Sequence, residues 1–136
     1  MNSCGRALPV PDYTLLFERI FMNNSSPLSE QSIDFSVLIV NYYKWLSKEK
    51  NEFVMSKQIL KSGTSIGANI HEANFAISKA DFITKMQIAL KEASETEYWL
   101  IVLNKTGYLP EEFRHLNEKC RSIKRMLIST LNTSKK

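Results

Sequence analysis

The sequence predicts an all-α fold, a single antiparallel, up-and-down bundle of four helices. Apolar residues recur every three or four positions in four consecutive segments, the spacing that puts side chains on one face of an α-helix. Only four glycines and four prolines occur among 136 residues, too few for the many turns of an all-β domain. The breaks between the segments are short, and short connections join antiparallel neighbours in a bundle.

A chain of 136 residues is long enough for one domain to bury its own core. We place this domain at residues 28–133. Residues 1–27 are expected to be an N-terminal extension that is poorly ordered or not native to the protein, with Met22 as an alternative start. Charged residues such as Arg19 interrupt this extension, which argues against a signal peptide.

The composition favours a cytoplasmic protein with no membrane association. Cys4 lies in the extension and Cys120 on an apolar helical stripe, so the two cysteines indicate no disulfide framework and fit a reducing compartment. The longest strongly apolar run is far shorter than the roughly 20 residues that a membrane-crossing helix needs.

The first predicted helix covers about residues 29–50 and is apolar around most of its circumference. Ser29 is its expected N-cap. Its core stripe consists of Phe35, Leu38, Ile39, Tyr42 and Leu46. Four further apolar or aromatic residues lie outside this stripe: Val37, Val40, Tyr43 and Trp45. We predict that these four form an oligomer interface; the alternative is a wide core-facing surface with a few exposed aromatic rings.

The second predicted helix starts near Asn51 and carries small residues between its apolar ones. Its apolar positions are Phe53, Ile59, Leu60, Ile66 and Ile70. Gly63 and Gly67 stand one turn apart, and each glycine inside a helix costs about 1 kcal/mol relative to alanine. We therefore expect a neighbouring helix to approach closely there. A phosphate-binding loop is disfavoured because no strand precedes the segment and no Gly-Lys-Ser/Thr ending follows.

The third and fourth predicted helices each carry a regular apolar seam. Ser78 and Asp81 form a capping-box-like start for the third helix, and Gly107 is its expected stop. Ala89 and Ala93 narrow the middle of its seam, so we expect it to lie against the small residues of the second helix. The fourth helix begins near residue 111, and its seam contains Phe113, Leu116, Cys120, Ile123, Leu127 and Thr130.

No arrangement of side chains in the sequence predicts catalysis, a metal site or a cofactor. Cys120 occupies a core position with no predicted partner base. His71 and Glu72 are adjacent, so they point apart on a helix and do not form a dyad. Glu112 and His115 match half of a diiron signature, but the sequence has no second such pair.

Positive charge is concentrated in the last predicted helix and the tail. Seven of the 18 Lys and Arg residues but only three of the 14 Asp and Glu residues follow residue 109. We predict a basic strip that binds nucleic acid, formed by Arg114, Arg121, Lys124 and Arg125. The alternative is a solvated helix face whose cations complement the helix dipole.

A family resemblance is carried by a motif that spans the second and third helices. Its positions are Ser65, Ile66, Asn69, Ile70 and Glu72, then Ser78, Lys79, Asp81 and Phe82, then Ile88, Ala89, Glu92, Ala93, Glu95, Thr96, Tyr98, Gly107, Tyr108 and Leu109. The motif resembles that of small four-helix-bundle proteins encoded in intervening sequences of bacterial 23S rRNA genes. The likeness covers about residues 28–131. Gly67 and Ala73 depart from it, because many relatives have proline and glycine there.

The resemblance implies a homo-oligomeric ring, with a pentamer favoured, and no enzymatic activity. A related group serves diversity-generating retroelements as an accessory protein that binds a reverse transcriptase and nucleic acid. The motif residues carry over as structural ones: Ser65, Gly67, Asn69, Glu72, Ser78 and Asp81. Among them we predict an inter-helix polar network of Ser65, Asn69, Glu72 and Asp81.

Two functional hypotheses follow from the sequence. The first is a non-enzymatic oligomer that binds structured RNA or other nucleic acid through its basic last helix. The second is a protein-interaction scaffold or an accessory subunit for a partner enzyme such as a reverse transcriptase. An enzyme is disfavoured because no set of nucleophile, base and oxyanion donor is complete.

Overall fold

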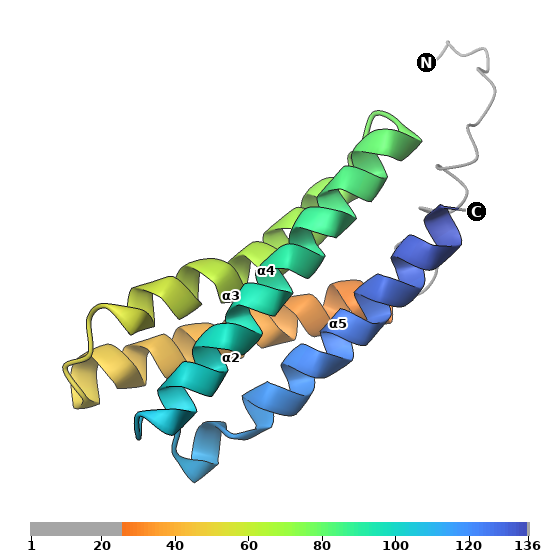
Figure 1. Ribbon diagram of the computed structural model, residues 1–136. Coiled ribbons are helices and arrows are strands. Elements are labelled where there is room, and N and C mark those ends of the chain that lie inside the picture. Colours follow the sequence, from red (N-terminus) through yellow and green to blue (C-terminus); the bar gives the residue numbers. More distant parts are fainter. Residues whose placement is uncertain (1–25, 136) are drawn as a thin grey trace, which may run out of the picture.

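The computed structural model describes residues 26–135 as four antiparallel helices in an up-and-down bundle (Figure 1). In order, they are α2 (Pro27–Glu49), α3 (Met55–Ala73), α4 (Lys79–Lys105) and α5 (His115–Ser134), with a short 3₁₀ helix, η2 (Glu111–Phe113), before α5. This part of the chain contains no strand, so the predicted fold class is confirmed. The extension predicted for residues 1–27 lies outside the described residues, except for Ser26 and Pro27.

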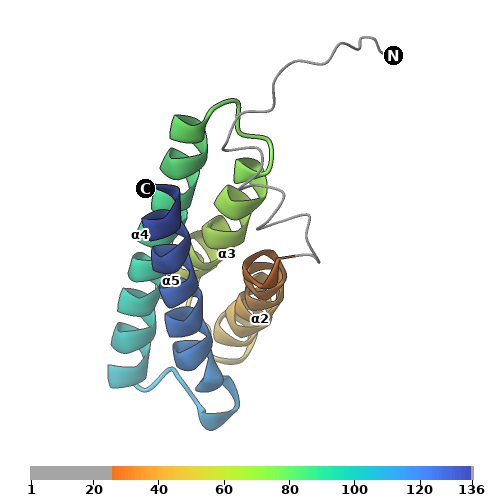
Figure 2. The same cartoon turned by 90° about the vertical axis from the view of Figure 1, so that its right-hand side faces the viewer.

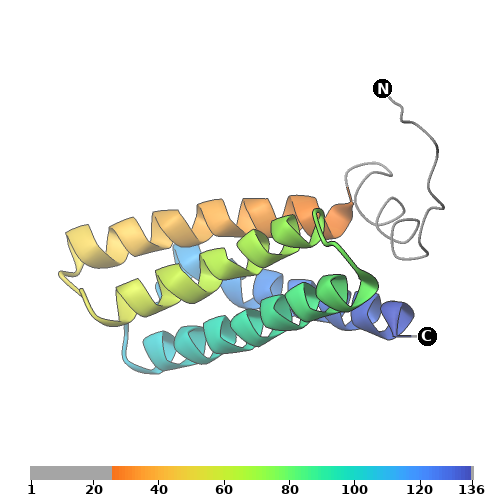
Figure 3. The same cartoon turned by 90° about the horizontal axis from the view of Figure 1, so that it is seen from above.

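Each helix packs against its sequence neighbours, and α5 closes the bundle against α2. Helix α3 contacts both α2 and α4, whereas α5 contacts α4 and, less extensively, α2. Figure 2 shows α2 and α4 on opposite sides of the bundle, with α3 and α5 between them. Figure 3 shows that the start of α2, the α3–α4 connection and the end of α5 share one end of the molecule.

Helix α2 starts earlier than the sequence predicts. Ser26 is the N-cap, and its Oγ accepts a 3.5 Å hydrogen bond from the Ser29 amide. Pro27 opens the helix, where its missing N–H costs nothing because that donor has no partner within the helix. The prediction of Ser29 as the cap is therefore wrong by three residues.

Helix α3 starts later than predicted, because residues 50–54 form a tight connection. Asn51 adopts a positive φ of 52°, a left-handed conformation that asparagine tolerates better than most residues. The Glu52 carboxylate then accepts hydrogen bonds from the amides of Val54, Met55 and Ser56 at 3.2, 3.1 and 2.7 Å. These are amides that the first turn leaves without helical partners. Glu52 thus caps α3, and the predicted start near Asn51 is wrong.

The glycines of α3 bring its backbone close to α2. A Cβ at Gly63 would lie 2.9 Å from the Ile39 side chain, and one at Gly67 would lie 3.2 Å from the Ser32 carbonyl oxygen. The predicted close approach is confirmed, with α2 as the neighbour at the two glycines, and α3 also packs along α4 as predicted, where Ser62 meets Thr96. Ala93 of α4 instead meets α5, where the Cys120 Sγ donates to its carbonyl oxygen at 3.4 Å.

Both predicted ends of α4 are confirmed. The Ser78 Oγ accepts from the Asp81 amide at 3.0 Å, and the Asp81 carboxylate accepts from the Ile77 amide at 3.2 Å. At the other end Gly107 has a φ of 86°. The Tyr108 amide donates to the Leu103 carbonyl at 2.8 Å, which completes a Schellman-type stop.

The core consists of the apolar stripes that the helical spacing predicts, with a few exceptions. Residues such as Ile39, Ile66 and Leu100 are fully buried. Phe53 is exposed, because it lies in the connection before α3. Thr130 is half-buried and the neighbouring Leu131 fills the end of the α5 seam. One polar pair is buried among the apolar side chains, where the Thr96 hydroxyl donates to Ser62 Oγ at 3.0 Å.

Candidate interaction surfaces

The described residues contain no arrangement that suggests chemistry. Within residues 26–135 no three His, Cys, Asp or Glu side chains lie close enough to hold a metal ion. Cys120 is fully buried, and burial raises the pKa of its thiol to about 12, so a reactive thiolate does not form near neutral pH. No described helix is both long and apolar enough to cross a membrane.

Three of the four predicted basic residues gather around Glu97, where α5 lies against α4. Lys124 Nζ lies 2.8 Å from a Glu97 carboxylate oxygen, and Arg121 Nε lies 3.7 Å from the other. Hydrogen bonding from Lys124 lowers the pKa of the Glu97 carboxyl group below its usual value. Arg125 Nη2 approaches Glu118 to 3.4 Å, and Arg121 Nη1 lies 3.9 Å from the same carboxylate.

Arg114 lies apart from these three, at the start of α5. Its Nε is 3.1 Å from Glu111 in η2, and its Nη1 donates to the Asn104 side-chain oxygen at 3.5 Å. Every predicted nucleic-acid-binding residue therefore has a carboxylate neighbour. The side chains of Arg121 and Arg125 nevertheless remain 56% and 64% exposed. The strip is thus a mixed-charge surface with exposed guanidinium groups rather than a continuous array of free cations.

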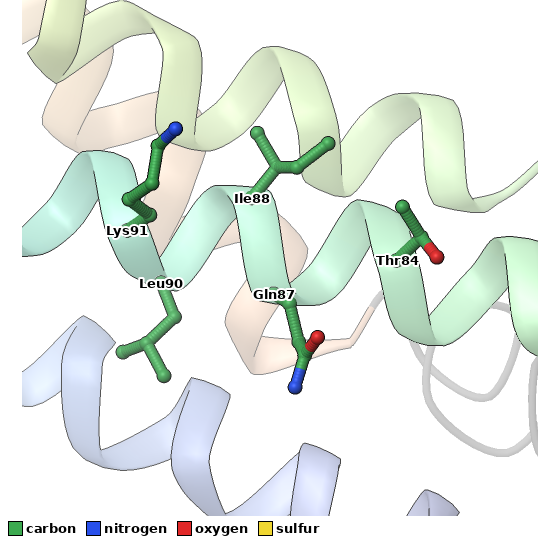
Figure 4. A pocket seen from close by; sticks show the side chains of 5 residues that line it. All are labelled: Thr84, Gln87, Ile88, Leu90 and Lys91. Atoms are coloured by element: carbon green, nitrogen blue, oxygen red, sulfur yellow. The ribbon is translucent and has the colours of Figure 1, made fainter.

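A shallow hollow of about 200 Å³ lies within this mixed-charge surface. Its lining combines the Glu97, Arg121, Lys124 and Arg125 side chains with Ile128 of α5. Further along the outward side of α4 a wider, open depression of about 440 Å³ is lined by Thr84, Gln87, Ile88, Leu90 and Lys91. Figure 4 shows Leu90 pointing toward α5 and Ile88 toward α3, so two apolar side chains flank this depression.

The outward side of α2 presents exposed aliphatic side chains. Val37 is 55% exposed and Ile33, one turn earlier, is 57% exposed. Ile33 was not among the residues predicted for an interface, although its spacing from Val37 is the signal that identifies it. Val40 and Tyr43 are half-buried.

Trp45, the fourth residue predicted for the interface, packs against other residues of the same chain. Its ring stacks on Tyr42 with centroids 6.2 Å apart and meets Phe113 at 5.7 Å. The Tyr42 hydroxyl donates to the Tyr108 carbonyl oxygen at 2.7 Å, and burial raises the pKa of Tyr42 above its usual value. This aromatic cluster ties α2 to the connection between α4 and α5.

The motif residues make separate local contacts instead of the predicted network. Asn69 Nδ2 donates to the Ser65 carbonyl oxygen at 2.9 Å within α3. Glu72 pairs with Lys85 at 2.8 Å, which links α3 to α4. Asp81 caps the start of α4. The prediction of one inter-helix network is therefore wrong, and buried hydrogen bonds between helices are instead made by Ser62 with Thr96 and by Cys120 with Ala93.

The described residues thus define a small helical-bundle protein whose outer faces carry exposed apolar and charged groups. The chain belongs to the 23S rRNA-intervening sequence protein family, whose sequence profile matches residues 26–129. This confirms the family that the motif indicates.

A solved structure is similar to this chain. It is the 1.70 Å crystal structure of a protein with unknown function from the S23 ribosomal protein family of Bacteroides thetaiotaomicron VPI-5482. The two chains are 55% identical with a TM-score of 0.75, over 77% of this chain and 95% of that chain. A comparison with curated proteins gives no match.

Proposed function

We propose that this protein is a non-enzymatic, self-assembling scaffold, a homo-oligomer that works in the cytoplasm. The exposed aliphatic residues on the outward side of α2 support this function most directly. Ile33 and Val37 face away from a core that α2 already fills with Phe35, Ile39 and Tyr42. Neighbouring exposed aliphatic groups on one helix face are typical of a surface that another protein covers. A ring of five copies is the arrangement that the family resemblance favours.

The test of self-assembly is the mass of the purified full-length protein in solution, measured by size-exclusion chromatography with light scattering. The expected result is a single species several times the 15.7 kDa of the chain. Val37→Glu is expected to reduce that mass, because it places a charge in an apolar contact. Phe75→Glu is the control, since Phe75 is also exposed, at 74% against 55% for Val37, but lies in the α3–α4 connection. A monomeric wild type at micromolar concentration contradicts the proposal.

Binding of structured RNA is the second candidate function. Its support is the exposure of the Arg121 and Arg125 guanidinium groups, which present several donors to phosphate oxygens. The carboxylates of Glu97 and Glu118 weigh against RNA binding, because both lie within the mixed-charge surface and repel phosphate. For this reason we rank scaffolding first.

RNA binding is tested by fluorescence anisotropy. The nuclease-treated protein is titrated against an RNA hairpin and a DNA duplex, each at low and near-physiological salt. If the basic surface binds RNA, affinity falls steeply with salt, and the slope becomes shallower in a variant with Arg121→Gln, Lys124→Gln and Arg125→Gln. A variant with Lys57→Gln and Lys61→Gln on α3 is the control. No binding at low salt leaves the scaffold as the function.

A further inference from the structure

Two carboxylates on the outward side of α2 have no ionic partner within the described residues. Glu30 and Asp34 are exposed, and neither forms an ion pair with a residue in 26–135, although Asp34 lines a small hollow together with Lys119 of α5. They lie beside Ile33 and Val37 on the same outward surface of the helix. We call these four residues the α2 face, an acidic surface with an apolar stripe.

The mixed-charge surface along α4 and α5 has the complementary character. Arg121, Lys124 and Arg125 carry one positive charge more than the two carboxylates with which they pair. Exposed apolar side chains accompany them: Ile128 on α5 lines the same hollow, and Tyr98 and Ile101 on α4 follow Glu97 by one and four residues. We call these six residues the α4/α5 face. Aromatic, aliphatic and arginine side chains together are typical of protein interfaces rather than of solvated surfaces.

We infer that the α2 face of one copy docks on the α4/α5 face of the next copy. This inference rests on the proposed self-assembly and names the two surfaces that form the contact. The exposed guanidinium groups of Arg121 and Arg125 can donate further hydrogen bonds, and Glu30 and Asp34 supply the carboxylates that receive them. Ile33 and Val37 meet the apolar side chains that border those cations.

The order of charges along the helices agrees with this contact. In α2, Glu30 and Asp34 stand one turn apart near the start of the helix. In α5, Arg121 and Arg125 are likewise four residues apart. When the two helices lie antiparallel, Glu30 can therefore meet Arg125 while Asp34 meets Arg121. Copies related by rotation about an axis along the bundle have this relative direction, because α2 and α5 are antiparallel within each copy.

The positions of the two faces determine the kind of assembly. Figure 2 shows α2 and α4 on opposite sides of the bundle with α5 between them, so the α2 face and the α4/α5 face are two different surfaces of one copy. The contact is therefore heterologous, with each copy using different faces toward its two neighbours. Such a contact produces a ring when the rotation closes and a filament when it does not.

Charge reversal tests the pairing of these two faces. One variant carries Glu30→Lys and Asp34→Lys, a second carries Arg121→Glu and Arg125→Glu, and a third carries all four changes. We expect each of the first two to sediment as a monomer, because like charges then meet across the contact. The third variant is expected to regain the wild-type mass, since its reversed faces again complement each other. Circular-dichroism melting checks that each variant is folded, and Asp34→Lys alone replaces the first variant if that one unfolds.

Different outcomes distinguish this inference from the proposed function. An assembled wild type whose mass is unchanged in the first two variants overturns the pairing of these faces but leaves self-assembly intact. Loss of assembly in the first variant alone also overturns it, because the α2 face then meets some other surface. A monomeric wild type overturns the proposed function and this inference together. Reversal of Lys57 and Lys61 to glutamate on α3 is the control, and it is expected to leave the mass unchanged.

Discussion

Single residues decide how closely the helices approach. Gly63 faces the Ile39 side chain, and a Cβ there would lie only 2.9 Å from two of its carbon atoms. Gly67 similarly faces backbone and hydroxyl oxygens of α2. The helix-propensity cost of two glycines is thus offset by tight packing of α3 on α2.

Replacement of Gly63 by alanine tests this packing. The methyl group improves helix propensity by about 1 kcal/mol, but overpacking a tight contact costs about 1–3 kcal/mol. Because Ile39 is fully buried and cannot easily move, we expect net destabilisation of about 1 kcal/mol in urea-induced unfolding. A Gly63→Ala variant that is more stable than the wild type would show that the contact has room for a side chain.

The Glu97 carboxylate is predicted to make stability depend on pH. Lys124 lowers the folded-state pKa of Glu97 below the usual 4.5, so the stabilisation is present above pH 4.5 and is lost as the pH falls through the lowered folded-state pKa. We expect Glu97→Gln to cost about 0.5 kcal/mol at pH 7 and nothing near pH 2. Urea titrations at several pH values measure this, with Glu95→Gln on the same helix as the control. An equal effect of Glu97→Gln at both pH values contradicts the pairing.

The helices themselves were predictable from sequence because their core faces follow a simple period. The seams of α4 and α5 lie where the three-and-four spacing places them, and Gly107 stops α4 through its positive φ. The starts of α2 and α3 were misplaced for a physical reason. Ser26 and Ser29 are both good caps, and only the backbone decides between them. Glu52 caps through a connection whose shape depends on the left-handed Asn51.

Removal of the Glu52 side chain is predicted to destabilise the start of α3. Its carboxylate accepts from three amides, so Glu52→Ala leaves those donors to water and is expected to cost about 1 kcal/mol. Thermal and urea unfolding measure the change. Glu49→Ala, at the exposed end of α2, is the control with a smaller expected effect. Equal effects of the two substitutions would refute the capping role.

The charged surface of the molecule was harder to predict than its fold, and the basic residues of α5 show why. The sequence locates Arg121 and Lys124 on one helix, but their partner Glu97 comes from α4, 24 or more residues away in the chain. Which side chains meet across two helices depends on their relative rotation and offset, which the core packing fixes. The predicted strip of cations is therefore a mixed-charge surface, and the carboxylates of Glu30 and Asp34, which form no ion pair within residues 26–135, lie on the neighbouring helix α2.

Self-assembly through the outer helix faces is the function that we propose for this protein. The most direct test of self-assembly is sedimentation-velocity ultracentrifugation of the full-length protein. The protein concentration is varied from 1 to about 100 μM, a range that includes the concentrations typical of specific oligomers. We predict one species whose mass is a constant multiple of 15.7 kDa and that falls to the monomer in Val37→Glu. A wild-type protein that sediments as a monomer across the whole range would contradict the claim.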